Sequence, residues 1–284
     1  VAALGAVVAL PFTLIKTRQN ERQTRATEEG LITDRINNAV EGLGAEKKID
    51  RIGRPVTRPT AGGGEEITIE WKDKPIDGAV PVEGAKWEVF SETRPNLEVR
   101  IGAILALERL ARNNLDIHVQ IMEILCAYIR QNAPASEAQE TLVQKWRRED
   151  EAFDAKDRAP FPDENEILVA AQKLKSPRAD IHAALDVLKR RHTHQINLER
   201  QDPRPADKAG YRLDLRRTNL QGADLVSAQL AKARLDDAHL EGAELYRAHL
   251  EGAGLDGAHL EGAALDRAHL ERARLLGAQL ERAR

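Results

Sequence analysis

The sequence predicts an α + β-solenoid protein, in which an α-helical part precedes a β-solenoid. Three observations lead to this fold class. The first 15 residues carry no charge, and several segments between residues 97 and 200 have apolar residues at helical spacing. From Leu215 to Leu280 a leucine stands at every fifth position. A chain of 284 residues is long enough for two domains of ordinary size.

Composition limits the function classes. The chain has 43 basic and 46 acidic residues, a formal net charge of −3, which gives no general case for nucleic-acid binding. One cysteine, Cys126, excludes an internal disulfide framework and fits a reducing compartment. It lies in the apolar run "IMEILCAYI", so we expect a buried, unreactive side chain.

The uncharged opening at residues 1–15 predicts the C-terminal part of a membrane helix. Spanning a bilayer takes about 20 apolar residues, and a chain that begins upstream of Val1 would supply the missing turns. Residues 16–25 hold four basic residues and one acidic residue, which places this flank on the cytoplasmic side. We therefore expect a bacterial inner-membrane protein with its bulk in the cytoplasm. A signal-peptide remnant and a short buried helix are the alternatives.

Residues 16–44 have the pattern of a juxtamembrane amphipathic helix. Its apolar stripe consists of Leu31, Ile32, Ile36, Val40 and Leu43.

Residues 45–96 are expected to form a linker and a small β insertion. The stretch "RPVTRPTAGGGEE" has the composition of a linker. After it, "ITIEWKD" and "KWEVF" alternate apolar and polar residues, which predicts a hairpin of two strands between Ile67 and Phe90.

Residues 97–200 predict a compact α-helical domain. The segments "EVRIGAILALERLARNN" and "DIHVQIMEILCAYIR" are apolar on all sides, as buried helices are. Asp116 is the expected N-cap of the second. A further pair follows, "ENEILVAAQKLK" and "DIHAALDVLKRR", the former with a capping box of Asp163 and Glu166.

The period of five decides the last part of the fold. Leucine occupies 14 consecutive pentads, and alanine precedes it by two places in 12 of them. In an α-helix, five residues turn about 500°, so these leucines would form no stripe. In a strand, an odd period would put successive leucines on opposite faces. A square coil of four pentads instead points every leucine at the axis. The expected core residues are Leu215, Leu220, Leu225, Leu230, Leu235, Leu240, Leu245, Leu250, Leu255, Leu260, Leu265, Leu270, Leu275 and Leu280.

The segments "GADLVSAQL" and "TNLQGADL" match the motif A(D/N)LXX, so residues 213–284 resemble the pentapeptide-repeat family. That resemblance implies a right-handed quadrilateral β-helix for residues 201–284. The order of "DRINNAVEGLG", "EVRIGAILALERLAR" and "AALDVLKRR" before the pentads is also similar to bacterial membrane-anchored members with an N-terminal helical domain. The helical domain is expected to cap the first coil. The open C-terminal coil makes an end-to-end homodimer possible.

Residues 20 apart in such a coil share one side of the rod, about 4.8 Å apart. This places His239, Glu241, His259 and Glu261 together, and His249, Glu251, His269 and Glu271 on the opposite side. These eight residues are the candidate interaction face. Histidine beside carboxylate also suits a metal site, but a flat ladder lacks the concavity and the supporting second layer of residues that such sites need.

No catalytic or cofactor motif is present, and we predict no enzyme activity, cofactor or metal ligand. Local capping explains His118 and His182, each after an Asp-Ile pair, better than metal ligation does.

Two functions fit these observations. The first is a non-enzymatic, membrane-anchored scaffold that presents its rod on the cytoplasmic face to an unidentified protein partner, such as a membrane complex, and binds no nucleic acid. The second comes from the family resemblance, which implies that some members mimic DNA and bind type II topoisomerases. That mimicry needs an acidic rod. Residues 211–284 hold 12 acidic and 11 basic residues, a net charge of 11 − 12 = −1, which argues against it.

Overall fold

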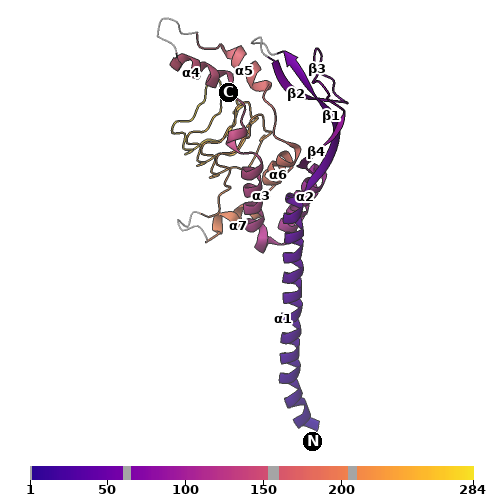
Figure 1. The fold of residues 1–284 in the computed structure, drawn as a ribbon. Helices are drawn as coiled ribbons and strands as arrows, with labels where there is room; N and C mark the ends of the chain where they lie inside the picture. The colour runs from indigo at the N-terminus through magenta and orange to yellow at the C-terminus, as the bar shows by residue number, and fades with distance from the viewer. Residues whose placement is uncertain (1, 60–64, 153–159, 204–209) are drawn as a thin grey trace. The chain divides into compact units, whose positions relative to one another are not determined.

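The computed structural model describes residues 2–59, 65–152, 160–203 and 210–284. The chain divides into two units, one of residues 44–100 and one that combines residues 1–43 with residues 101–284. Figure 1 shows the helices and strands, coloured from the N-terminus to the C-terminus.

The second unit begins with one long helix, α1 (Ala2–Leu43), which joins the two N-terminal segments expected from the sequence. Lys16 and Arg18 follow the uncharged opening at once, in the same helix. No helix in the described residues is long and apolar enough to cross a membrane.

The transmembrane segment predicted at residues 1–15 is therefore wrong, and so is the inner-membrane location, with the bulk of the chain in the cytoplasm, that followed from it. The amphipathic stripe expected at residues 16–44 is narrower than predicted. Ile36 and Leu43 are buried and Ile32 is partly buried, whereas Leu31 and Val40 are exposed.

Residues 44–100 hold a four-stranded antiparallel sheet around the 14-residue strand β1 (Glu46–Pro59). One half of β1 pairs with β4 (Glu88–Pro95), and the other half pairs with β2 (Glu65–Trp71) and with β3 (Val80–Pro81). The predicted hairpin is thus wrong in its pairing, because β2 and β4 both bind β1.

The stretch "RPVTRP", which reads as a linker, lies inside β1, whereas residues 60–64 of the expected linker lie outside the described residues. Its arginines pair across the sheet, with the Nε of Arg54 2.7 Å from a carboxylate oxygen of Glu70. Gly53 is needed in β1 because a Cβ atom there would lie 2.7 Å from the Ile69 side chain on β2.

The helices between residues 97 and 201 are α2 (Leu97–Asn113), α3 (His118–Asn132), α4 (Leu142–Ala152), α5 (Glu164–Gln172), α6 (Ala179–Lys189) and α7 (Thr193–Gln201). Two single 3₁₀ turns, Leu115–Ile117 and Ala135–Glu137, flank α3. The predicted capping box of α5 is confirmed, with Asp163 and Glu166 each accepting the other's backbone N–H. Asp116 caps nothing, because it lies within the first 3₁₀ turn and α3 begins after Ile117.

Residues 211–284 form the predicted quadrilateral coil. Isolated parallel β-bridges join residues 20 apart, and each leucine N–H from Leu215 to Leu265 donates to a carbonyl of the next coil, as from Leu220 to His239 (2.8 Å). The residue two places after each of the 14 leucines has a positive φ of 53° to 70°, which turns the chain at every corner. The ten leucines from Leu215 to Leu260 are buried, Leu265, Leu270 and Leu275 are partly buried, and Leu280 is exposed.

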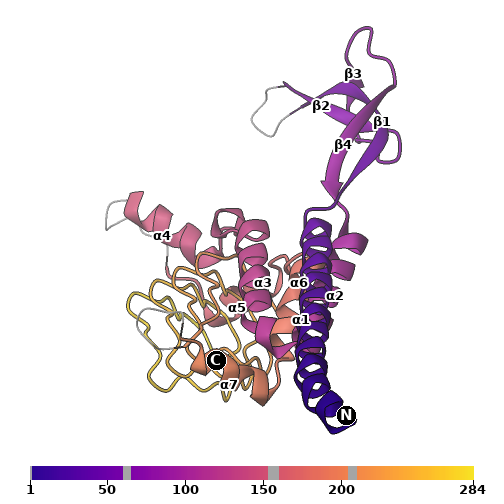
Figure 2. The ribbon, with the colours of Figure 1, turned by 90° about the horizontal axis from the view of Figure 1, so that it is seen from below.

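The helices close the first coil, as expected. The chain after α3 pairs with this coil, the Asn219 N–H donating to the Ala133 carbonyl (2.7 Å) and the Ala135 N–H to the Arg217 carbonyl (2.9 Å). In Figures 1 and 2, α3 and α6 lie between α1 and the coils. One continuous apolar core runs from Leu43 through these helices to Leu260.

Introducing a charge or a large ring into this core should unfold the rod. Leu250→Asp buries a carboxylate and Ala258→Trp overfills a position with no exposed surface, so each should cost roughly 4 kcal/mol or more. Thermal denaturation followed by circular dichroism measures this loss. Glu244→Ala, at an exposed outward position, should melt near the unmodified protein. A normal melting curve for Leu250→Asp would contradict the inward register of the leucines.

Candidate functional site

The two histidine–glutamate ladders lie where the period of five puts them. His239 bridges to His259, and their rings stack with centroids 4.4 Å apart. On the opposite side, His249 bridges to His269, with centroids 4.8 Å apart. We call these the first and the second ladder. They differ in what covers them.

The first ladder, His239, Glu241, His259 and Glu261, lies beneath α4. From that helix, the Gln144 side-chain amide donates to Oε1 of Glu241 (3.0 Å) and lies 3.2 Å from Nδ1 of His259. One turn further along α4, Arg147 binds Gln279 and Glu281 of the last coil. The side chains of Glu241 and Glu261 are 0% and 2% exposed, so this ladder offers no open surface to a partner.

Two corner glycines let α5 pack on the same side of the rod. A Cβ atom at Gly242 would lie 2.8 Å from the Ala171 carbonyl oxygen, and one at Gly262 would lie 2.8 Å from Ala171 Cβ. Both residues also have positive φ. Glycine at these two corners therefore serves both the turn and the helix that rests on it.

The second ladder, His249, Glu251, His269 and Glu271, is open. The exposed fractions of its side chains are 37%, 37%, 48% and 68% in that order. Nδ1 of His249 lies 2.9 Å from Oε1 of Glu251. Partial burial raises the pKa of Glu251, but the hydrogen bond with His249, a backbone hydrogen bond and the charges of His249 and His269 together leave the pKa below its ordinary value.

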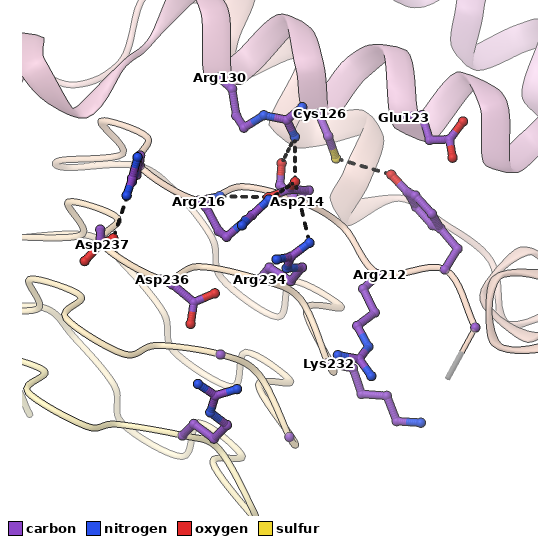
Figure 3. A pocket seen from close by; sticks show the side chains of 16 residues that line it. Glu123, Cys126, Arg130, Arg212, Asp214, Arg216, Lys232, Arg234, Asp236 and Asp237 are labelled. Atoms are coloured by element: carbon purple, nitrogen blue, oxygen red, sulfur yellow. Dashed lines mark hydrogen bonds and ion pairs between the residues drawn. The ribbon is translucent and has the colours of Figure 1, made fainter. Parts of the chain in front are cut away.

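A groove of about 1030 Å³ lies on the side of the rod next to the second ladder (Figure 3). Seven basic and four acidic side chains line it. The basic residues are Arg130, Arg212, Arg216, Arg217, Lys232, Arg234 and Arg274, and the acidic ones are Glu123, Asp214, Asp236 and Asp237.

Asp214 organises the upper end of the groove, where Figure 3 shows arginines converging on it. Arg216 forms two hydrogen bonds of 2.8 Å with its carboxylate, and Arg130 lies 3.4 Å from it. Burial raises the pKa of Asp214, yet the Arg216 hydrogen bonds and the Arg130 charge hold it below its ordinary value. A carboxylate that stays ionised keeps these arginines in place.

The lower end of the groove is hollow because the third coil has glycines there. Gly252 and Gly254 put no side chain between the coil of Lys232 and Arg234 and the coil of Arg274. A Cβ atom at Gly254 would lie 2.8 Å from a carboxylate oxygen of Asp236. The period of five marked neither glycine as special, so the groove was not foreseen from the sequence.

A buried polar cluster joins the helices to the coils. Nε2 of His118 lies 2.7 Å from a carboxylate oxygen of Glu199, and Arg191 binds the other oxygen and also the Gln229 carbonyl of the solenoid. The capping role expected for His118 is thus wrong, since its ring is fully buried against α7. Burial raises the pKa of Glu199, but His118 and Arg191 together leave it below its ordinary value. No sequence pattern predicts the pairing of His118 with Glu199, because the two residues lie 81 positions apart.

Comparison with known proteins concerns the coils alone. The family model for pentapeptide repeats matches residues 214–252 and 248–284, with 8 copies. No match was found among curated proteins.

Three solved structures are similar to part of the chain. A pentapeptide repeat protein from the Arabidopsis thaliana thylakoid lumen is 28% identical over 21% of this chain and 41% of its own, with a TM-score of 0.21. HetL from the cyanobacterium Nostoc, described as involved in heterocyst differentiation regulation, is 37% identical over 28% of this chain and 40% of its own, with a TM-score of 0.13. Rfr23 from the cyanobacterium Cyanothece is 31% identical over 28% of this chain and 66% of its own, with a TM-score of 0.13. The chain spans less than two thirds of each of these proteins.

Cys126, at the groove wall, should not react in the folded protein. The Tyr211 hydroxyl lies 3.7 Å from its sulfur, and burial raises the thiol pKa to about 11. Because the thiolate is the reactive form, a disulfide reagent at pH 8 should leave the native thiol unmodified and consume one equivalent after denaturation. The released chromophore reports the reaction. Fast, stoichiometric reaction of the native protein would show that this wall of the groove opens.

Proposed function

Because residues 214–284 place this chain in the pentapeptide-repeat family, we propose that it is a non-enzymatic interaction module that binds an acidic protein segment along one side of its rod. Pentapeptide-repeat proteins are generally structural or interaction modules, and the chain matches no enzyme family. The partner is a protein as yet unidentified, and the groove is the observation that supports this choice.

The charge of the groove favours an acidic occupant. Its lining has a formal net charge of 7 − 4 = +3, whereas the whole rod from residue 211 has a net charge of −1. Lys232 makes no ion pair with any described residue, and Arg217 holds Asp237 at 3.5 Å with its own side chain 80% exposed. These two cations are available to a partner. The guanidinium group of arginine suits carboxylates because its N–H groups can bind both carboxylate oxygens at once.

The binding surface continues onto the second ladder. Lys232 stands at the corner between the groove and a neighbouring hollow of about 370 Å³, which His249, Glu251, Arg191 and Tyr211 also line. A polypeptide lying in the groove can thus cross the corner and reach His249 and Glu251 of the second ladder. The side with the first ladder is excluded from this surface because α4 and α5 occupy it.

The DNA-mimic alternative has the wrong charge on this surface. A phosphate-like side would present carboxylates, whereas the groove presents arginines. The expected result with a type II topoisomerase is unchanged supercoiling. The end-to-end homodimer stays a separate prediction, which light scattering of the full chain measures.

Reversing two charges at the groove should weaken partner binding. Lys232→Glu with Arg234→Glu removes two attractive charges and adds two repulsive ones, so binding of a fluorescent poly-glutamate peptide should fall about tenfold or more. Fluorescence anisotropy at low and at physiological salt measures the dissociation constant. Arg247→Glu with Arg267→Glu, which reverses two exposed charges at another corner of the rod, is the matched control. Equal affinity of the two variants would contradict the groove as the binding site.

The second ladder has its own test. Replacing His249, Glu251, His269 and Glu271 with alanine should abolish capture of the natural partner and leave the far-ultraviolet circular dichroism spectrum unchanged, because the four side chains point outward. Capture is measured by affinity purification from source cells followed by mass spectrometry. Undiminished capture would remove this ladder from the interface.

A further inference from the structure

The first ladder has the chemistry of a metal site on a side of the rod that the proposed function does not use. Nδ1 of His239 lies 2.8 Å from Oε1 of Glu241, and the Gln144 amide nitrogen lies 3.0 Å from that oxygen and 3.2 Å from Nδ1 of His259. Ligand atoms of His239, Glu241 and His259 lie within 4.8 Å of one another. Two imidazoles and a carboxylate are a donor set that Zn²⁺ binds, and a small movement of these side chains would bring their ligand atoms to one ion.

Burial adds an independent reason. Glu241 Oε2 and both carboxylate oxygens of Glu261 are buried, with no hydrogen-bond partner, whereas on the second ladder this holds for Glu251 Oε2 alone. Glu261 follows Glu241 by one coil, and its Oε1 lies 3.9 Å from Nδ1 of His259. A buried carboxylate without a partner is costly, and a cation beside it removes that cost. The buried carboxylate oxygens that lack a hydrogen-bond partner therefore belong to the same cluster as His239 and His259.

A flat ladder would lack the enclosure that metal sites need, and α4 supplies it. Gln144 is fixed by its own helix start, accepting from the Thr141 N–H (3.0 Å) and donating its N–H to the Thr141 hydroxyl (3.2 Å). Beside it, a cavity of about 60 Å³ is lined by Thr141, Val143, Ile167 and Glu261. The Gln144 amide thus closes the ladder from above and gives it a second layer of residues.

We propose that His239, Glu241 and His259 bind a divalent transition-metal ion of the Zn²⁺ class beneath α4, with Glu261 as the neighbouring carboxylate that balances its charge. The ion lies between Glu241 and His259, at the place that the Gln144 side-chain amide nitrogen occupies in this structure. Its role is structural. It ties two successive coils together, because His239 and Glu241 belong to one coil and His259 to the next.

The second ladder is a control built into the chain. It repeats the same residues at the same spacing, and Glu251, His269 and Glu271 also lie within ligand distance of one another. Its side chains are 37% to 68% exposed, and among the described residues no glutamine from a helix hydrogen-bonds to it. A site that depends on enclosure should therefore bind metal tightly on the first ladder only.

Metal binding to the full chain tests the proposal. Tag-free protein, stripped with a chelator, is titrated with Zn²⁺ against a chromophoric competitor, and Co²⁺ is used to record the absorption spectrum of the bound ion. We expect one tight ion per chain. His239→Gln with His259→Gln should weaken it more than about tenfold, whereas His249→Gln with His269→Gln should leave it unchanged. Equal Zn²⁺ affinity of both double variants, or no tight ion in the unmodified chain, would overturn the proposal.

Two single variants keep the test independent of folding. Glu241→Gln preserves size and should lose the tight ion while retaining the native circular dichroism spectrum. Gln144→Glu adds a carboxylate from α4, so Zn²⁺ should bind more tightly and raise the melting temperature of this variant above that of its metal-free form. A melting temperature that Zn²⁺ leaves unchanged would overturn the proposal. Binding of poly-glutamate at the groove should not respond to any of these changes, so the two proposals fail separately.

Discussion

The narrow interior of the coil constrains everything else in this protein. Each side of a 20-residue coil places one leucine and one smaller residue inward, and the backbone of that coil is hydrogen-bonded to the next. Burying a leucine side chain contributes about 1.5–3 kcal/mol, but only once another layer covers it. The first coil therefore needs the helices. Leu213, Leu215 and Leu220 belong to the same core as Cys126 and Leu185.

Because the interior is fixed, the sides are free to differ. Glycine corners at Gly242 and Gly262 admit α5 and, with α4, close one side. On a neighbouring side, Gly252 and Gly254 leave a hollow between charged coils. The same backbone thus gives a covered ladder of histidines and glutamates, an open one, and an arginine-lined groove. Their chemical difference comes from what the helices cover and where side chains are missing.

The sequence predicted most strongly what the coil itself dictates. The inward leucines, the pairing of His239 with His259 and the capping box at Asp163 each depend on local spacing, which can be read without a structure. Local spacing does not predict the contacts that the side chains of Gln144 and His118 make. Their partners, His259 and Glu199, lie 115 and 81 residues away, and only packing brings them together.

Two errors have a common physical origin. The prolines of β1 read as a linker, although they lie in a strand that pairs with three others. The apolar opening of α1 read as a membrane helix, although the charged residues that follow it continue the same helix. In both cases the composition of a short segment suggests one structure, whereas the helix or strand that forms is longer than that segment. The sequence predicts no metal site for a similar reason. A ladder considered without its neighbours is flat, whereas in the structure α4 covers the first ladder.

One apolar core spans the helices and the coils, and the stability of each depends on the other. Hydrogen exchange of the full chain, followed by mass spectrometry in rising denaturant, tests it directly. The amides of α3 and of the coils from Leu215 to Leu235 should lose protection together, in a single transition, because neither layer is covered without the other. Coil amides that stay protected after α3 has exchanged would contradict the shared core. In that case the helices would be an attachment to a rod that is stable without them.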